Sequence, residues 1–131
     1  MNTGLLLIII LFIQRSNLHS MEVLKLIFAL AMMHLVAWSS SNNQFVLGSK
    51  KYSFLLCIAL GIVSSLISYA VTNNWYGKYT MWELRMITFS TSFLVFPFMT
   101  WKFFGENPFE AKTLVSIALS LIMIGVQIFW K

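Results

Sequence analysis

Three ionisable side chains lie where a largely apolar chain could use them for chemistry. His34 is in the middle of an apolar run, and Glu83 and Arg85 begin a later one. Ionisable groups inside a membrane are costly and often functional, and an imidazole titrates near neutrality, so His34 is a candidate proton carrier. Glu83 and Arg85 would then act as a gate or substrate anchor. Simpler interpretations also exist: a neutral histidine bonded to a neighbouring helix, a helix cap for Glu83, and a headgroup contact for Arg85.

The rest of the sequence has no pattern typical of an enzyme. Two histidines and the single cysteine, Cys57, are too few and too scattered for a metal site. Nucleophile triads, phosphate loops and haem motifs do not occur in it. We therefore expect no enzymatic activity, no metal and no cofactor. The net charge of +5 comes without a basic cluster, which argues against nucleic-acid binding and fits contact with lipid headgroups.

The elements that hold these side chains are expected to be membrane-spanning helices. Hydrophobic residues make up 59% of the chain and charged residues 10%, too apolar a composition for a soluble domain of this size. The predicted fold is an all-α, integral membrane four-helix bundle with a short apolar amino-terminal extension. The expected spans are about 21–39, 50–70, 81–104 and 108–130. The lipid bilayer is therefore an expected partner, and the cell (inner) membrane is the expected location.

Local signals define the ends of the last two spans. Thr80 and Glu83 have the spacing of a capping box, which satisfies free N–H groups at a helix start. Gly105 suits the left-handed position that ends a helix. Asn107 is the predicted N-cap of the last helix, with Pro108 at its first position, where no N–H donor is needed.

Residues 1–20 have two interpretations. The run Leu5–Ile13 is too short to span a bilayer, and it lacks the basic start of a signal peptide. Ser20-Met21-Glu22 is typical of a fresh helix start. Residues 1–20 are then either an extension before an initiator at Met21, or a half-helix lying in the membrane interface. The lysines and arginines divide five against four between the two sides, which predicts insertion in both orientations.

Packing residues are expected in the last two spans. Pro97 is predicted to kink the hydroxyl-rich span 81–104, which is either a mobile pore element or an ordinary packing helix. Ser116, Ser120 and Gly125 in the last span are predicted to form a self-association surface, because small residues permit close helix approach.

Two segments resemble the drug/metabolite transporter (DMT) superfamily. The third and fourth helices of small multidrug resistance proteins are similar to SFLVFPFMTWKFFGENPFEAKTLVSIALSLIMIGVQIFW. The shared features are a W-x-F-F-G-type turn and the pattern Leu121, Ile122, Gly125, Val126 in the last helix. A branch of short DMT-type proteins of unassigned function has a helix start similar to Glu83-Leu84-Arg85-Met86-Ile87. The resemblance implies a four-helix subunit that pairs with itself.

The first span departs from that family. Small multidrug resistance proteins carry a membrane-embedded glutamate in their first helix, which binds proton and substrate in turn. Here the corresponding segment is LKLIFALAMMHLVAWSS, which contains no acid, and His34 lies near the glutamate's place. The resemblance therefore transfers no catalytic or substrate-binding residue.

Two functions are consistent with these observations. The leading hypothesis is a small DMT-type multi-pass membrane protein that forms a homodimeric transporter or transporter-like subunit for a small-molecule substrate. The alternative is a non-transporting scaffold or accessory subunit of a larger membrane complex. An acid or base facing a central cavity would favour transport, and a fully apolar, close-packed centre would favour the scaffold.

Overall fold

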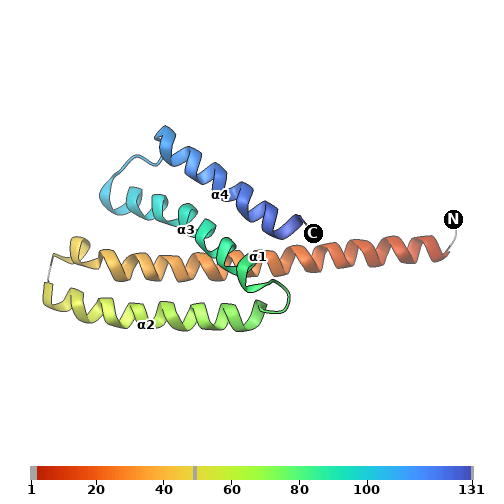
Figure 1. The fold of residues 1–131 in the computed structure, drawn as a ribbon, viewed down its shortest axis with the longest axis horizontal. Helices are drawn as coiled ribbons and strands as arrows, with labels where there is room; N and C mark the ends of the chain where they lie inside the picture. The colour runs from red at the N-terminus through yellow and green to blue at the C-terminus, as the bar shows by residue number, and fades with distance from the viewer. Residues whose placement is uncertain (1–2, 49, 131) are drawn as a thin grey trace.

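The protein consists of four helices in the computed structural model, which describes the backbone of residues 3–48 and 50–130 and the side chains of 19–48 and 52–130. The helices are α1 (Thr3–Leu47), α2 (Lys50–Trp75), α3 (Met81–Phe104) and α4 (Ala111–Phe129). In Figure 1, α1 and α2 lie antiparallel, α3 packs on α1, and α4 packs on α3. The predicted all-α, four-helix architecture is confirmed.

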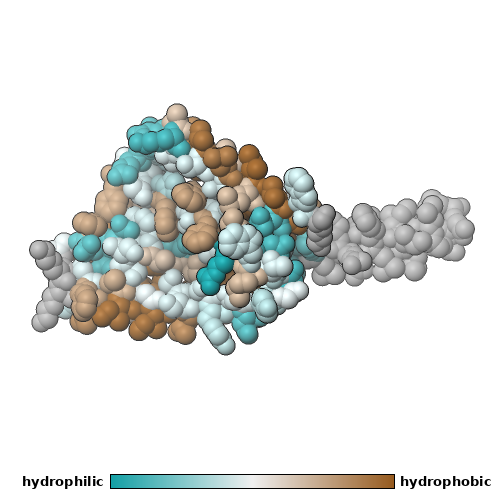
Figure 2. Space-filling model, in the orientation of Figure 1, coloured by the Kyte–Doolittle hydropathy of each residue, from teal (hydrophilic) through white to brown (hydrophobic). Residues whose placement is uncertain are grey.

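Three of the helices are long and apolar enough to cross a membrane. Their apolar segments are His19–Leu47, Tyr52–Trp75 and Ala111–Phe129. Helix α3 has 24 residues but is not among them, since its hydroxyl groups and three charged side chains lower its hydropathy. The outer faces of α2 and α4 are apolar and exposed, as the brown surfaces in Figure 2 show. Such faces are stable in lipid, where apolar side chains need no cover.

Helix α1 is longer than the sequence predicted. It runs without a break through Ser20-Met21-Glu22, so the helix start expected there is absent. It also continues beyond residue 39, where the first span was expected to end. The side chains of Ser39, Ser41 and Asn42 donate hydrogen bonds to the carbonyls four residues earlier. These polar groups thus have partners within the helix and do not end it.

The helix-end predictions are correct for α3 and wrong for α4. The Thr80–Glu83 capping box is present, and Gly105 ends α3 in the left-handed conformation with φ of 69°. Helix α4 begins at Ala111, and its N-cap is Glu110 instead of Asn107. The Asn107 side chain accepts a hydrogen bond from the backbone N–H of Phe109, which forms a local turn before the helix.

An apolar core joins all four helices. Its buried members are Leu26, Leu30, Met33, Val71, Leu84, Ile87 and Ile128. Tyr79, in the link between α2 and α3, packs against this core. Burial raises the pKa of the Tyr79 hydroxyl above its ordinary value, and the Glu83 carboxylate adds to the increase, so the group stays neutral.

We expect Leu30→Ala to destabilise the bundle by about 2–5 kcal/mol, because it leaves a cavity in this core. Leu30 is 1% exposed, and Leu24, on the lipid-facing side of the same helix, is 72% exposed. Leu24→Ala is thus the matched control and should change stability by about 0.5 kcal/mol or less. Unfolding in mixed detergent micelles, followed by circular dichroism, measures both. Equal losses would show that Leu30 is not in a packed core.

Candidate functional site

His34 is buried about halfway along the apolar segment of α1. Its side chain is 7% exposed, and its Nε2 lies 2.8 Å from the backbone carbonyl oxygen of Thr88 in α3. A carbonyl only accepts hydrogen bonds, so Nε2 carries the hydrogen and donates it. In the neutral ring, Nδ1 then has the free lone pair. Any proton that this histidine takes up would bind at Nδ1.

The surroundings of His34 are apolar and aromatic. The ring of Phe96 meets the imidazole edge-on, with 5.7 Å between centroids. The hydroxyl of Thr88 is directed to the carbonyl of Leu84 at 2.7 Å and so is not the group that holds His34. Among the buried side chains that the structure describes, His34 is the only ionisable one. His34 is therefore an ionisable side chain in an apolar environment, held by one backbone acceptor.

Glu83 and Arg85 are not brought together with His34. The Glu83 carboxylate accepts a hydrogen bond from the Thr80 backbone N–H at 2.6 Å, and the Glu83 N–H donates to the Thr80 hydroxyl at 3.2 Å. Both hydrogen bonds of the predicted capping box are therefore present, with Thr80 as the N-cap and Glu83 as its partner. Arg85 is exposed on α3. In this chain, the three candidate residues do not share one site.

The hydroxyl groups of α3 bond mainly to their own helix. Thr88, Thr91 and Thr100 donate to the carbonyls four residues earlier, and Ser92 donates to that of Phe89. Helix α3 continues through Pro97, and the predicted kink there stays a prediction. These hydroxyls therefore find their hydrogen-bond acceptors within α3 and do not donate to a neighbouring helix.

Other polar side chains form hydrogen bonds between α1 and α2. The Ser40 hydroxyl donates to the carbonyl of Cys57 at 2.8 Å, and the Ser64 hydroxyl donates to that of Met33 at 3.4 Å. The sequence did not predict these partners, because a backbone acceptor on another helix has no sequence signal.

The residues predicted for self-association lie on two different faces of α4. Ser120 is buried, and together with Ser116 it lines a groove of about 280 Å³ between α3 and α4. A Cβ atom added at Gly125 would meet nothing within 4 Å, so this glycine borders open space. The three residues therefore do not form one surface, and their predicted role in self-association stays a prediction.

A charged cluster joins α1 to the link between α2 and α3. The Glu22 carboxylate contacts Lys25 at 3.0 Å and Lys78 at 2.8 Å. The sequence did not predict the contact with Lys78, because Glu22 and Lys78 are 56 positions apart. These groups are partly exposed, and ion pairs at such positions contribute little to stability. Over the described residues, no three His, Cys, Asp or Glu side chains gather to hold a metal ion.

The comparisons with known proteins give no relative. No family model, curated protein or solved structure matches this chain. The similarity to drug/metabolite transporters therefore stays a prediction, carried by the residues quoted above.

The tautomer of His34 can be tested directly. We expect nitrogen NMR of protein labelled at histidine to show a neutral ring with hydrogen on Nε2 near neutral pH, because the Thr88 carbonyl requires a donor there. The variant His19→Gln leaves His34 as the only histidine and assigns the signal. A ring with hydrogen on Nδ1 alone would contradict the contact.

Proposed function

We propose that the chain is a small, multi-pass DMT-type protein of the cell (inner) membrane that works as a homodimeric transporter or transporter-like subunit for a small molecule. The observation that carries this proposal is the buried, mid-span imidazole of His34. Ionisable groups at such depth are rare, and they often mark proton or substrate pathways. In this proposal, Nδ1 takes up a proton in a state that water can reach, while Nε2 keeps α1 attached to α3.

The need for a second copy follows from the packing of one chain. The centre of the four helices is filled by apolar side chains such as Leu26, Leu30 and Ile87, which are 0–1% exposed. A pathway would therefore have to form between subunits, where eight helices can surround it. Gly125 supplies a position on α4 where another helix can approach closely.

A second candidate is favoured by the same packed centre. A non-transporting scaffold or accessory subunit of a larger membrane complex needs no cavity, and it needs His34 only as a fixed hydrogen bond between α1 and α3. The two functions differ in whether the imidazole ever exchanges a proton with water.

His34→Gln separates these functions, because glutamine can donate a hydrogen bond to the Thr88 carbonyl but cannot titrate near neutrality. With the chain in liposomes that contain a pH-sensitive dye, a panel of small organic molecules is added under a proton gradient. Under the transport proposal, at least one compound moves protons with the wild type, and the variant loses this movement while its helix content is unchanged. Proton movement that survives in the variant would refute the role of His34, and a silent wild type would favour the scaffold.

Gly125→Leu should shift the protein towards monomer, since the added side chain fills the open space at this position and blocks close helix approach. Crosslinking in mild detergent measures the dimer fraction. Ala59→Leu is the control, because Ala59 is exposed on α2, away from α4. An unchanged dimer fraction in Gly125→Leu, or an equal loss in the control, would place the interface elsewhere.

A further inference from the structure

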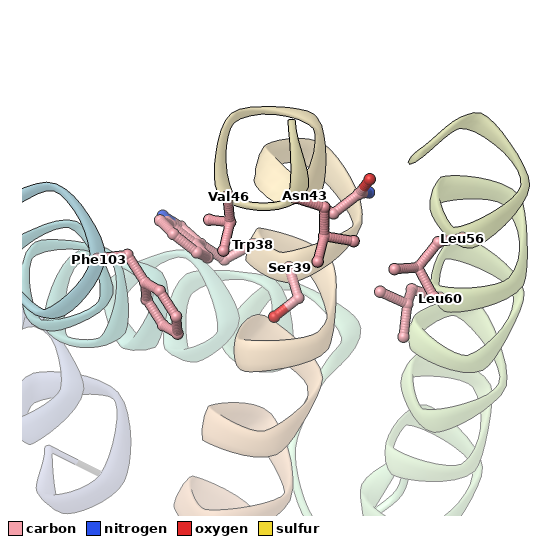
Figure 3. A pocket seen from close by; sticks show the side chains of 8 residues that line it. Trp38, Ser39, Asn43, Val46, Leu56, Leu60 and Phe103 are labelled. Atoms are coloured by element: carbon pink, nitrogen blue, oxygen red, sulfur yellow. The ribbon is translucent and has the colours of Figure 1, made fainter. Parts of the chain in front are cut away.

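An open groove runs between α3 and α4. It has a volume of about 280 Å³ and is lined by Met86, Phe89, Ser90, Phe93, Ser116, Leu119, Ser120 and Met123. Its large apolar side chains are accessible, since Phe89, Phe93 and Leu119 are between 53% and 62% exposed. A second apolar cavity, bordered by α1, α2 and α3 near Trp38 and Phe103, holds only about 100 Å³ (Figure 3). The groove is therefore the larger apolar site of the two.

The polar groups of the groove are engaged or out of reach. The Ser116 hydroxyl donates to the carbonyl of Lys112 at 2.9 Å, and the Ser120 hydroxyl donates to that of Ser116 at 2.8 Å. The Oγ atom of Ser90 is buried, so an occupant cannot reach it. None of the lining side chains is charged. The groove thus has no side-chain donor for a polar ligand, and its walls favour a hydrocarbon.

The groove lies at the depth of lipid acyl chains. Met86 and Phe93 are about 8 and 18 Å along α3 from its first residue, Met81, at about 1.5 Å per residue. The end of α4 lies near the start of α3 (Figure 1). Trp82 and Trp130 at this end are 70% and 79% exposed, which is typical of the membrane interface. In a bilayer, the groove would begin just inside the headgroup region and extend into the hydrocarbon.

An unpaired cation, Arg85, lies next to the groove on its headgroup side. It is four residues before Phe89, so the two side chains are neighbours on the surface of α3. Helical side chains lean towards the helix start, which directs the guanidinium to the headgroups. Arg85 is exposed and has no ion pair or hydrogen bond in the described part of the chain. The nearest acid along the helix, Glu83, is bound to the Thr80 N–H in the capping box.

A second copy of the chain in the same orientation would not pair with this cation. The chain has four acidic residues. Glu22 is already shared by two lysines, and Glu83 caps its own helix. Glu106 and Glu110 follow the other end of α3 and so lie at a different depth. The free positive charge therefore favours an anion that the membrane itself supplies.

We propose that the groove binds an acyl chain of an anionic phospholipid, and that Arg85 binds its phosphate. A guanidinium can bind phosphate with two parallel hydrogen bonds, and the apolar groove below it accommodates the chain. This site uses neither His34 nor a transport step, so it does not depend on the proposed function.

Photolabelling of the full chain in phosphatidylcholine liposomes tests the site. The probe is a trace of phosphatidylglycerol with a diazirine in the middle of one acyl chain, and the comparison is phosphatidylcholine with the same chain. We expect phosphatidylglycerol to label the peptides with Met86–Phe93 and Ser116–Met123 about fivefold more, the effect of one arginine near an anionic lipid. The preference should fall in 1 M salt, where charges are screened beyond about 3 Å.

Arg85→Gln should remove this preference, and Arg85→Lys should keep much of it. Lys102→Gln is the matched control, because Lys102 is an exposed cation at the far end of the same helix. Ser116→Leu should fill the groove and lower its labelling by phosphatidylglycerol, whereas Ala118→Leu, on an exposed part of α4 outside the groove, should not.

Four outcomes would overturn the proposal. Equal labelling by the two lipids would mean ordinary boundary lipid, and labelling by neither would mean that a second copy covers the groove. The other two are a preference that persists in Arg85→Gln, and a preference that is lost equally in Lys102→Gln. Circular dichroism confirms that each variant keeps its helix content, and the salt dependence of the wild type tests the charge without any substitution.

Discussion

The structure depends on one constraint: inside lipid, every backbone N–H and C=O group must find its partner within the protein. A continuous helix meets this requirement by itself, and the described chain is helical nearly throughout. The same constraint governs the polar side chains. Ser39, Ser41, Thr91 and Thr100 add their hydrogen bonds to carbonyls of their own helix. Polar residues therefore do not interrupt these helices, and the few that bond to another helix fix how the helices are placed.

The sequence was most informative where a local signal exists. The capping box at Thr80 and the left-handed Gly105 depend on residues within a few positions, and α3 has the bounds that they predict. Helix α1 was predicted too short because serine and asparagine favour helix ends and turns in water, whereas here they bond back to the helix. Helix α4 starts late because the Asn107 side chain forms a turn with Phe109 in place of a cap.

The sequence predicted that His34 is buried in the membrane-spanning part, but it did not predict which residue His34 contacts. A histidine in an apolar run had to be buried or paired, and His34 is both. Its partner is a backbone carbonyl, and every residue of α3 carries one, so composition and spacing could not identify Thr88. The same holds for Ser40 and Cys57. A protonated imidazole would bind that carbonyl more strongly than a neutral one, since charged donors form stronger hydrogen bonds. Proton uptake at Nδ1 would thus tighten the contact between α1 and α3.

The unbroken length of α1 has a consequence for motion. Its position along its own axis is set by the apolar core and by polar contacts to the rest of the chain, including these three: Glu22 with Lys78, His34 with Thr88, and Ser40 with Cys57. They are spread over 18 positions, about 27 Å of rigid helix at about 1.5 Å per residue. A piston-like slide by one turn, about 5.4 Å, would break all three together. Helix α1 thus has one preferred position relative to the other helices, and a displacement of it along its axis would be a single concerted step.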